Sequence, residues 1–129
     1  MTQITSPESQ STKKQSSAQD ASMQECLANC LECAEICNTT LNHCLSMGGK
    51  HVESSHLKTL IACADICALS AQWMGREIQF HSDLCRTCAE VCNACAQSCG
   101  SFGPDDEAMQ ACVKVCRTCT DSCSKMASH

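Results

Sequence analysis

The sequence is poor in the large apolar side chains that normally fill the core of a globular domain. It contains no Tyr, one Trp and two Phe in 129 residues. Leu, Ile, Val and Phe together make up only about 15% of the chain, below the level expected of a folded core. A compact interior must therefore be filled by another residue type, or by something bound to it. The abundant candidate is Cys, with 16 residues.

The chain also lacks the patterns that mark nucleic-acid-binding, membrane-spanning and exported proteins. Its net charge is −5, and its only basic run is Lys13-Lys14, so we expect no nucleic-acid partner. No apolar run approaches the roughly 18 residues of a membrane span. Residues 1–21 are rich in Ser, Gln and Thr, without the apolar segment or arginine pair of an export signal. We expect a disordered polar tail there, one domain over residues 22–129, and a cytoplasmic location, where clustered Cys more often bind metal than form disulfides.

The cysteines fall in four clusters whose internal spacing is helical. Steps of three and four residues place side chains on one stripe of an α-helix, where an ordinary bundle has Leu, Ile or Val. The clusters are Cys26, Cys30, Cys33, Cys37 and Cys44; Cys63 and Cys67; Cys85, Cys88, Cys92, Cys95 and Cys99; and Cys112, Cys116, Cys119 and Cys123. The spacing therefore predicts four helices, each with cysteines on its buried face.

Residues typical of helix ends separate these clusters. We expect the first helix to end at Gly48-Gly49 and the second to run from a cap at Ser54 or Ser55 to Phe80. The third should follow a turn at His81, with a cap at Ser82 and an end at Gly100. The fourth should begin with a cap at Asp105-Asp106. Short connections make consecutive helices antiparallel neighbours. The fold class that we expect is all-α, an up-down-up-down four-helix bundle with a Cys-lined core.

The number and position of the cysteines limit their chemistry. A core packed only with Cys would be loose, because Cys is smaller than Leu. Disulfides within a helix fit poorly, since Cβ atoms at i and i+4 lie about 5–6 Å apart, against roughly 3.8 Å in a disulfide. Thiolates are soft ligands that select Cu(I), zinc or iron–sulfur clusters. Bound metal is therefore the best interpretation of the pattern.

Charge and spacing favour Cu(I) among these metals. The sequence has no C-x2-C-x2-C-x3-C loop of the ferredoxin type. Four zinc ions, each on four thiolates, would leave a charge of about −8 in a dry core, which is costly. Cu(I) needs only two thiolates, and each thiolate can bridge two ions. Sixteen Cys thus predict about 8 ions as isolated pairs and about 16 if every sulfur bridges, and charge neutrality favours the higher number.

Seven CxxxC pairs on four predicted helices carry a family resemblance. The pairs are Cys26/Cys30, Cys33/Cys37, Cys63/Cys67, Cys88/Cys92, Cys95/Cys99, Cys112/Cys116 and Cys119/Cys123. Over about residues 22–126 the chain resembles the copper storage proteins, small four-helix bundles lined with Cys. Without an export signal it is similar to their cytosolic branch, and this resemblance implies a homotetramer.

Histidines and methionines gather where the predicted helices end. Thioether and imidazole groups bind Cu(I) more weakly than thiolates and add no charge, which suits a port where ions enter and leave. We expect possible accessory ligands at the bundle ends, namely Met47, His56, Met109 and His43.

The function that this pattern predicts is the storage and buffering of many Cu(I) ions, with detoxification, and no enzymatic activity. A thiol–disulfide oxidoreductase is disfavoured, because its CxxC normally accompanies a βαβ unit, and here CxxC follows from the helical spacing. A metal-responsive sensor or a zinc-binding protein is the alternative. A sensor needs few sites, so the number of ions bound per chain separates it from a store.

Overall fold

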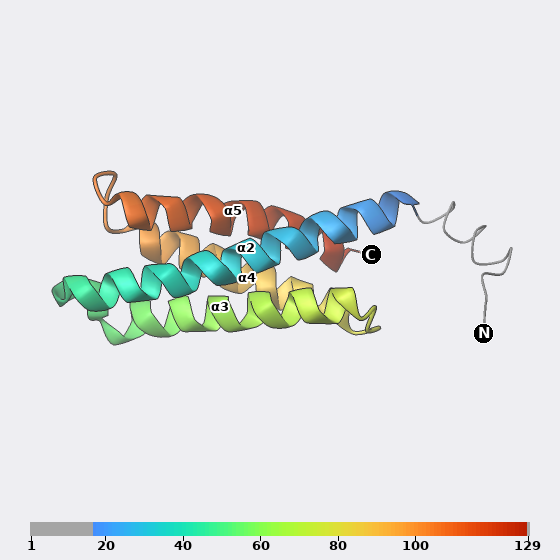
Figure 1. Cartoon of the computed structure of the whole chain (residues 1–129), viewed down its shortest axis with the longest axis horizontal. Helices are drawn as coiled ribbons and strands as arrows, with labels where there is room; N and C mark the ends of the chain where they lie inside the picture. Colours follow the sequence, from blue (N-terminus) through green and yellow to red (C-terminus); the bar gives the residue numbers. More distant parts are fainter. Residues whose placement is uncertain (1–16, 129) are drawn as a thin grey trace, which may run out of the picture.

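The computed structural model describes residues 17–128, with side chains described from residue 21 on, as an antiparallel four-helix bundle (Figure 1). The helices are α2 (Ser17–Met47), α3 (Ser54–Gly75), α4 (His81–Gly100) and α5 (Glu107–Ala127), and a short 3-10 turn, η1 (Gly49–Val52), joins α2 to α3. Each helix packs against two neighbours, α2 and α4 both lying between α3 and α5. The predicted all-α, up-down-up-down bundle is confirmed.

The two ends of the bundle are built differently. Figure 1 shows η1 and the connection between α4 and α5 together at one end, and the turn between α3 and α4 at the other end with the C-terminus. Gly48 and Gly49 have φ angles of 72° and 57°, which L side chains rarely adopt, so α2 ends at Met47 as predicted. Asp106 caps α5 as predicted, because its Oδ1 accepts a hydrogen bond from the Met109 backbone N–H at 3.2 Å.

The predicted end of the second helix at Phe80 is wrong. Helix α3 ends at Gly75 in a Schellman motif, in which the Ile78 N–H donates to the Trp73 carbonyl and the Glu77 N–H to the Met74 carbonyl. Glu77 occupies the left-handed position with φ 55°, where Gly is usual, so no glycine marks that position in the sequence.

Three other predicted boundaries also change. Glu53, and neither Ser54 nor Ser55, is the residue at the N-cap of α3, and no side chain caps that end. The turn precedes His81, so α4 begins at His81 with Phe80 at its N-cap, and Ser82 lies within the helix. Helix α2 begins at Ser17, inside the segment 1–21 assigned to a tail, and residues 1–16 lie outside the described residues.

The centre of the bundle is lined by sulfur. All sixteen cysteines are fully buried, together with small Ala residues at the helix contacts. The large side chains of the core lie towards its ends, and the largest fully buried ones are Leu60, Met74, Met109 and Met126. The fold thus places nearly every thiol of the chain in one shared interior.

Candidate metal centre

Thirteen of the sixteen cysteines form one continuous network, which we call the sulfur column. Each has at least one other Sγ atom at 3.4–4.0 Å, and these contacts join all thirteen. Its members are Cys26, Cys30, Cys33, Cys37, Cys63, Cys67, Cys88, Cys92, Cys95, Cys112, Cys116, Cys119 and Cys123. Every thiol in the column is free. The helical spacing read from the sequence is what brings them together.

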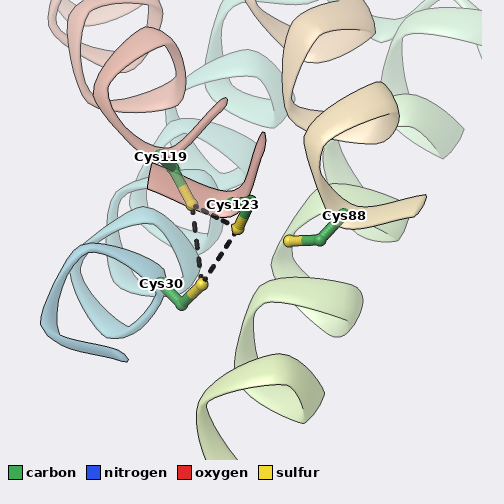
Figure 2. Close-up of side chains that lie close together, drawn as sticks. All are labelled: Cys30, Cys88, Cys119 and Cys123. Atoms are coloured by element: carbon green, nitrogen blue, oxygen red, sulfur yellow. Dashed lines mark hydrogen bonds between the residues drawn. The ribbon is translucent and has the colours of Figure 1, made fainter. Parts of the chain in front are cut away.

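One section of the column shows how three helices supply it (Figure 2). Cys30 of α2 lies 3.5 Å from Cys123 and 3.7 Å from Cys119, both on α5, and these two are 3.9 Å apart. Cys88 of α4 points into the same space, and the four sulfurs lie within 4.8 Å of one another. This group could hold a metal ion among three helices.

The separations match those of sulfurs that share a metal. With metal–sulfur bonds of about 2.3 Å, two sulfurs on one ion lie roughly 3.8 Å apart in a tetrahedral site and roughly 4.0 Å apart in a trigonal one. The observed 3.4–4.0 Å is close to both, and far from the roughly 2.05 Å of a disulfide. Little movement of the helices is needed to accommodate ions.

The four-cysteine groups overlap, which bears on the choice of metal. Cys33 and Cys63 belong both to a group with Cys37 and Cys116 and to a group with Cys67 and Cys92. Separate tetrahedral zinc sites cannot use the same sulfur twice without bridging. Sharing of sulfurs between adjacent ions is the arrangement that a Cu(I)–thiolate cluster requires.

Neighbouring sulfurs shift one another's proton affinity in opposite directions. The hydrogen bond with Cys116 lowers the pKa of Cys33, and that with Cys123 lowers the pKa of Cys119 to about 7. The contact with Cys119 raises the pKa of Cys67. Sulfurs with thiolate character, the form that binds metal, therefore stand beside sulfurs that keep their protons.

One end of the interior, which we call the histidine end, is formed by Cys44, His56 and Met109. The Cys44 Sγ lies 3.3 Å from the His56 Nε2 and 3.8 Å from the Met109 Sδ. The His56 Nδ1 lies 2.6 Å from the Ser98 Oγ, so a ring proton on Nδ1 leaves Nε2 free to face the sulfur. Burial lowers the pKa of His56 and keeps the ring neutral, while burial and then the charge of Asp106 raise the pKa of Cys44 to about 11.

The opposite end is closed by thioethers, and the half-buried His81 lies there with an Nδ1 atom that has no hydrogen-bond partner among the described residues. The Met74 Sδ lies 4.0 Å from the Cys85 Sγ, and Met126 is buried at the same end. Ser70 continues the stripe of α3 between Cys67 and Met74, fully buried, and its Oγ has no hydrogen-bond partner among the described residues.

Cys99, the remaining cysteine outside the column, neighbours Cys112 and Cys95, which raise its pKa.

The four predicted accessory ligands all lie at the histidine end, two of them in contact with Cys44 and two farther out. His56 and Met109 contact Cys44, but the His43 Nε2 faces Asp106 at 3.2 Å, and Met47 is 56% exposed. Sequence reasoning assigned no role to three neighbours of this end, His51, Ser98 and Phe102. The Phe102 ring lies 4.2 Å from the His51 ring and 4.8 Å from the His56 ring, centroid to centroid. Only the nearby His51 gave a sequence signal.

No helix in the described part of the chain is long and apolar enough to cross a bilayer.

A family model described as copper storage protein matches residues 19–128.

Solved structures share both the fold and part of the sequence. A protein of Nitrosospira multiformis is 42% identical with a TM-score of 0.78, over 84% of this chain and 97% of that one. The Cu(I)-bound copper storage protein BsCsp3, from Bacillus subtilis, is 35% identical with a TM-score of 0.75, over 82% and 98%. A copper storage protein from Streptomyces lividans, described as cytosolic, is 25% identical with a TM-score of 0.72 when loaded with 10 copper equivalents, over 84% and 85%.

Proposed function

The chain belongs to the copper storage protein family, and from this premise we propose that all sixteen of its cysteines are the ligands on which it holds copper. Its function is the storage of Cu(I), with many ions per chain bound to Cys inside a four-helix bundle. The residue assignment is our own. It rests on one observation, the complete burial of every cysteine and the linkage of thirteen of them at 3.4–4.0 Å.

The charge balance supports a high capacity. Sulfurs shared between overlapping groups of four favour bridged ions, and one Cu(I) per thiolate leaves the buried interior neutral. We therefore place the capacity between about 8 and about 16 ions per chain, with the bridged limit favoured. The same bridging disfavours a zinc protein with separate sites, and the large number of ligands disfavours a sensor.

We also propose a route for the ions. The histidine end has a neutral imidazole and a thioether beside Cys44, and these weaker ligands suit an entry and exit point. His56 and Met109 are thus the accessory Cu(I) ligands that we retain. His43 and Met47 lie farther out, so an ion would meet them before it reaches Cys44.

The surface and the thiols support three further assignments. Leu31, Leu45, Ile61 and Leu69 on α2 and α3 are 38–57% exposed, which suits a homo-oligomer, and we expect the tetramer implied by the resemblance. Sixteen free thiols suit a reducing compartment, so we place the protein in the cytoplasm. We expect no catalytic activity, because no cysteine is exposed as a nucleophile.

The experiment that tests the assignment is an anaerobic titration of the reduced protein with Cu(I) against a chromophoric Cu(I) chelator. Tight uptake of about 8 to 16 ions per chain is the expected result, and the plateau separates isolated pairs from bridged thiolates. Saturation at one or two ions would rule out the assignment of all sixteen cysteines. Prior loading with zinc should leave the plateau unchanged, because Cu(I) displaces zinc from soft ligands.

A further inference from the structure

Two imidazoles and one carboxylate meet just outside the histidine end. The Asp106 Oδ1 lies 3.2 Å from the His43 Nε2, and its Oδ2 lies 2.8 Å from the His51 Nε2. The three residues come from three different segments, His43 from α2, His51 from η1 and Asp106 from the N-cap of α5. All three side chains are largely shielded, with 27%, 15% and 15% of their surface exposed. None of the three has a sulfur among its hydrogen-bond partners in the described part of the chain.

The distances fit ligands of one small cation. Two ligand atoms on a tetrahedral ion with bonds of about 2.0–2.1 Å lie roughly 3.3 Å apart, and the nitrogen–oxygen separations here are 2.8–3.4 Å. Asp106 is ionised, so both rings now donate an Nε2 proton to it, and a metal ion would take the place of these two protons. Two His and one carboxylate form a set that suits borderline divalent ions such as Zn(II) and Cu(II).

The surroundings leave room for further ligands and add negative charge. A cavity of about 540 Å³ opens beside the cluster, lined by His43, Asp106, Met47, Asp105 and Glu107, among others. Water can therefore complete the coordination of an ion. The nearest cation, Lys50, donates from its Nζ to the Ser101 carbonyl at 3.1 Å and lies 4.9 Å over the Phe102 ring. Three carboxylates face the cavity, and their negative charge favours the binding of a cation.

We propose that His43, His51 and Asp106 form a second metal site, which binds one borderline divalent transition-metal ion and thereby closes the histidine end. This site differs from the copper store in ligands and in the charge of its ion. Soft Cu(I) goes to the buried sulfurs, whereas an N2O set at the surface holds a divalent ion.

The position of the site explains why its ion would control access to the store. An ion on His43, His51 and Asp106 ties α2, η1 and the start of α5 together. The Phe102 ring contacts both the His51 ring and the His56 ring, and His56 contacts Cys44, so a chain of contacts links the ion to the first thiol. Cu(I) should leave more slowly when the outer ion is bound.

Binding is tested on protein already loaded with Cu(I) to its plateau, so that the thiols are occupied. Dialysis against Zn(II), with both metals quantified, should show one zinc per chain. His43→Gln, His51→Gln and Asp106→Asn should each weaken zinc binding by roughly tenfold or more, and Asn still caps α5. His81→Gln, at the other end of the bundle, is the control and should bind zinc as the wild type does.

Two results would overturn the site. One is absence of zinc uptake, or uptake that survives all three substitutions. The other is sulfur-to-cobalt charge-transfer absorption when Co(II) replaces Zn(II), since this would place the ion on cysteines. The copper content of the same samples shows separately whether the store itself is loaded.

The closing role is tested by the rate at which a Cu(I)-selective chelator removes copper. Zinc should slow removal from the wild type and from His81→Gln, and it should have no effect on Asp106→Asn. If zinc binds but the wild-type rate does not change, the site stands and its closing role is wrong.

Discussion

Removal of the Ser98 hydroxyl should destabilise the apo-protein more than its small size suggests. The Ser98 Oγ lies 2.6 Å from the His56 Nδ1, and His56 is only 4% exposed. In Ser98→Ala the buried imidazole loses this partner. An unsatisfied buried polar group costs about 1–3 kcal/mol. With a urea m-value of roughly 1.5 kcal/mol per M, the unfolding midpoint should fall by about 0.7–2 M.

The assay is urea unfolding of reduced, metal-free protein, followed by circular dichroism. Ser101→Ala is a matched control, because it also removes a serine hydroxyl, three residues farther along the chain. The Ser101 side chain is exposed, and its hydroxyl donates to the Ser98 carbonyl. Its midpoint should move by less than about 0.3 M, as surface changes usually cost under 0.5 kcal/mol. Equal shifts for the two variants would refute the reasoning, since burial of His56 would then carry no penalty.

Three further predictions concern copper. Cys112→Ser with Cys116→Ser should lower the Cu(I) plateau by about two ions if sulfurs bridge and by about one if they form isolated pairs, whereas an unchanged plateau would remove both from the ligand set. Because burial raises the pKa of Cys44 to about 11, its thiol is protonated at neutral pH and Cu(I) must displace that proton. Apparent Cu(I) affinity should therefore rise with pH towards this pKa and fall in acid, and an affinity independent of pH would contradict the thiol assignment. Cu(I)-loaded protein should unfold at a higher urea concentration than the apo form, because ions that bind only the folded state stabilise it, and equal midpoints would argue against this.

The four helices and their buried faces were predictable because each follows from a local rule. A three-four spacing of cysteines is a property of one helix, and it survives packing when every helix carries the same pattern. Burial of all sixteen cysteines follows from that spacing together with the shortage of Leu, Ile, Val and Phe. Asp106 was also recognised as a helix cap from the sequence alone, since an N-cap depends only on its own turn.

Features that depend on how the helix ends meet could not be predicted. Glu77 occupies a left-handed position normally held by Gly, so the sequence around this position did not mark the turn that ends α3. His43 was named as an accessory copper ligand because histidines and methionines gather at the helix ends, yet it lies one position off the buried stripe and contacts Asp106. Asp106 is 63 residues away, and only the antiparallel packing of α2 and α5 brings the two together.

The arrangement of sulfurs also explains how one fold can serve both the empty and the filled store. Many structural zinc sites fold only when metal binds, because their ligands lie on loops that nothing else holds in place. Here the ligands lie on helices of 20 to 31 residues, and the packing of these helices sets sulfur separations of 3.4–4.0 Å. One Cu(I) per thiolate leaves the loaded core neutral, so the loaded store buries no large net charge. Loading then exchanges protons for ions within a nearly fixed frame, and the bundle can fill and empty without refolding.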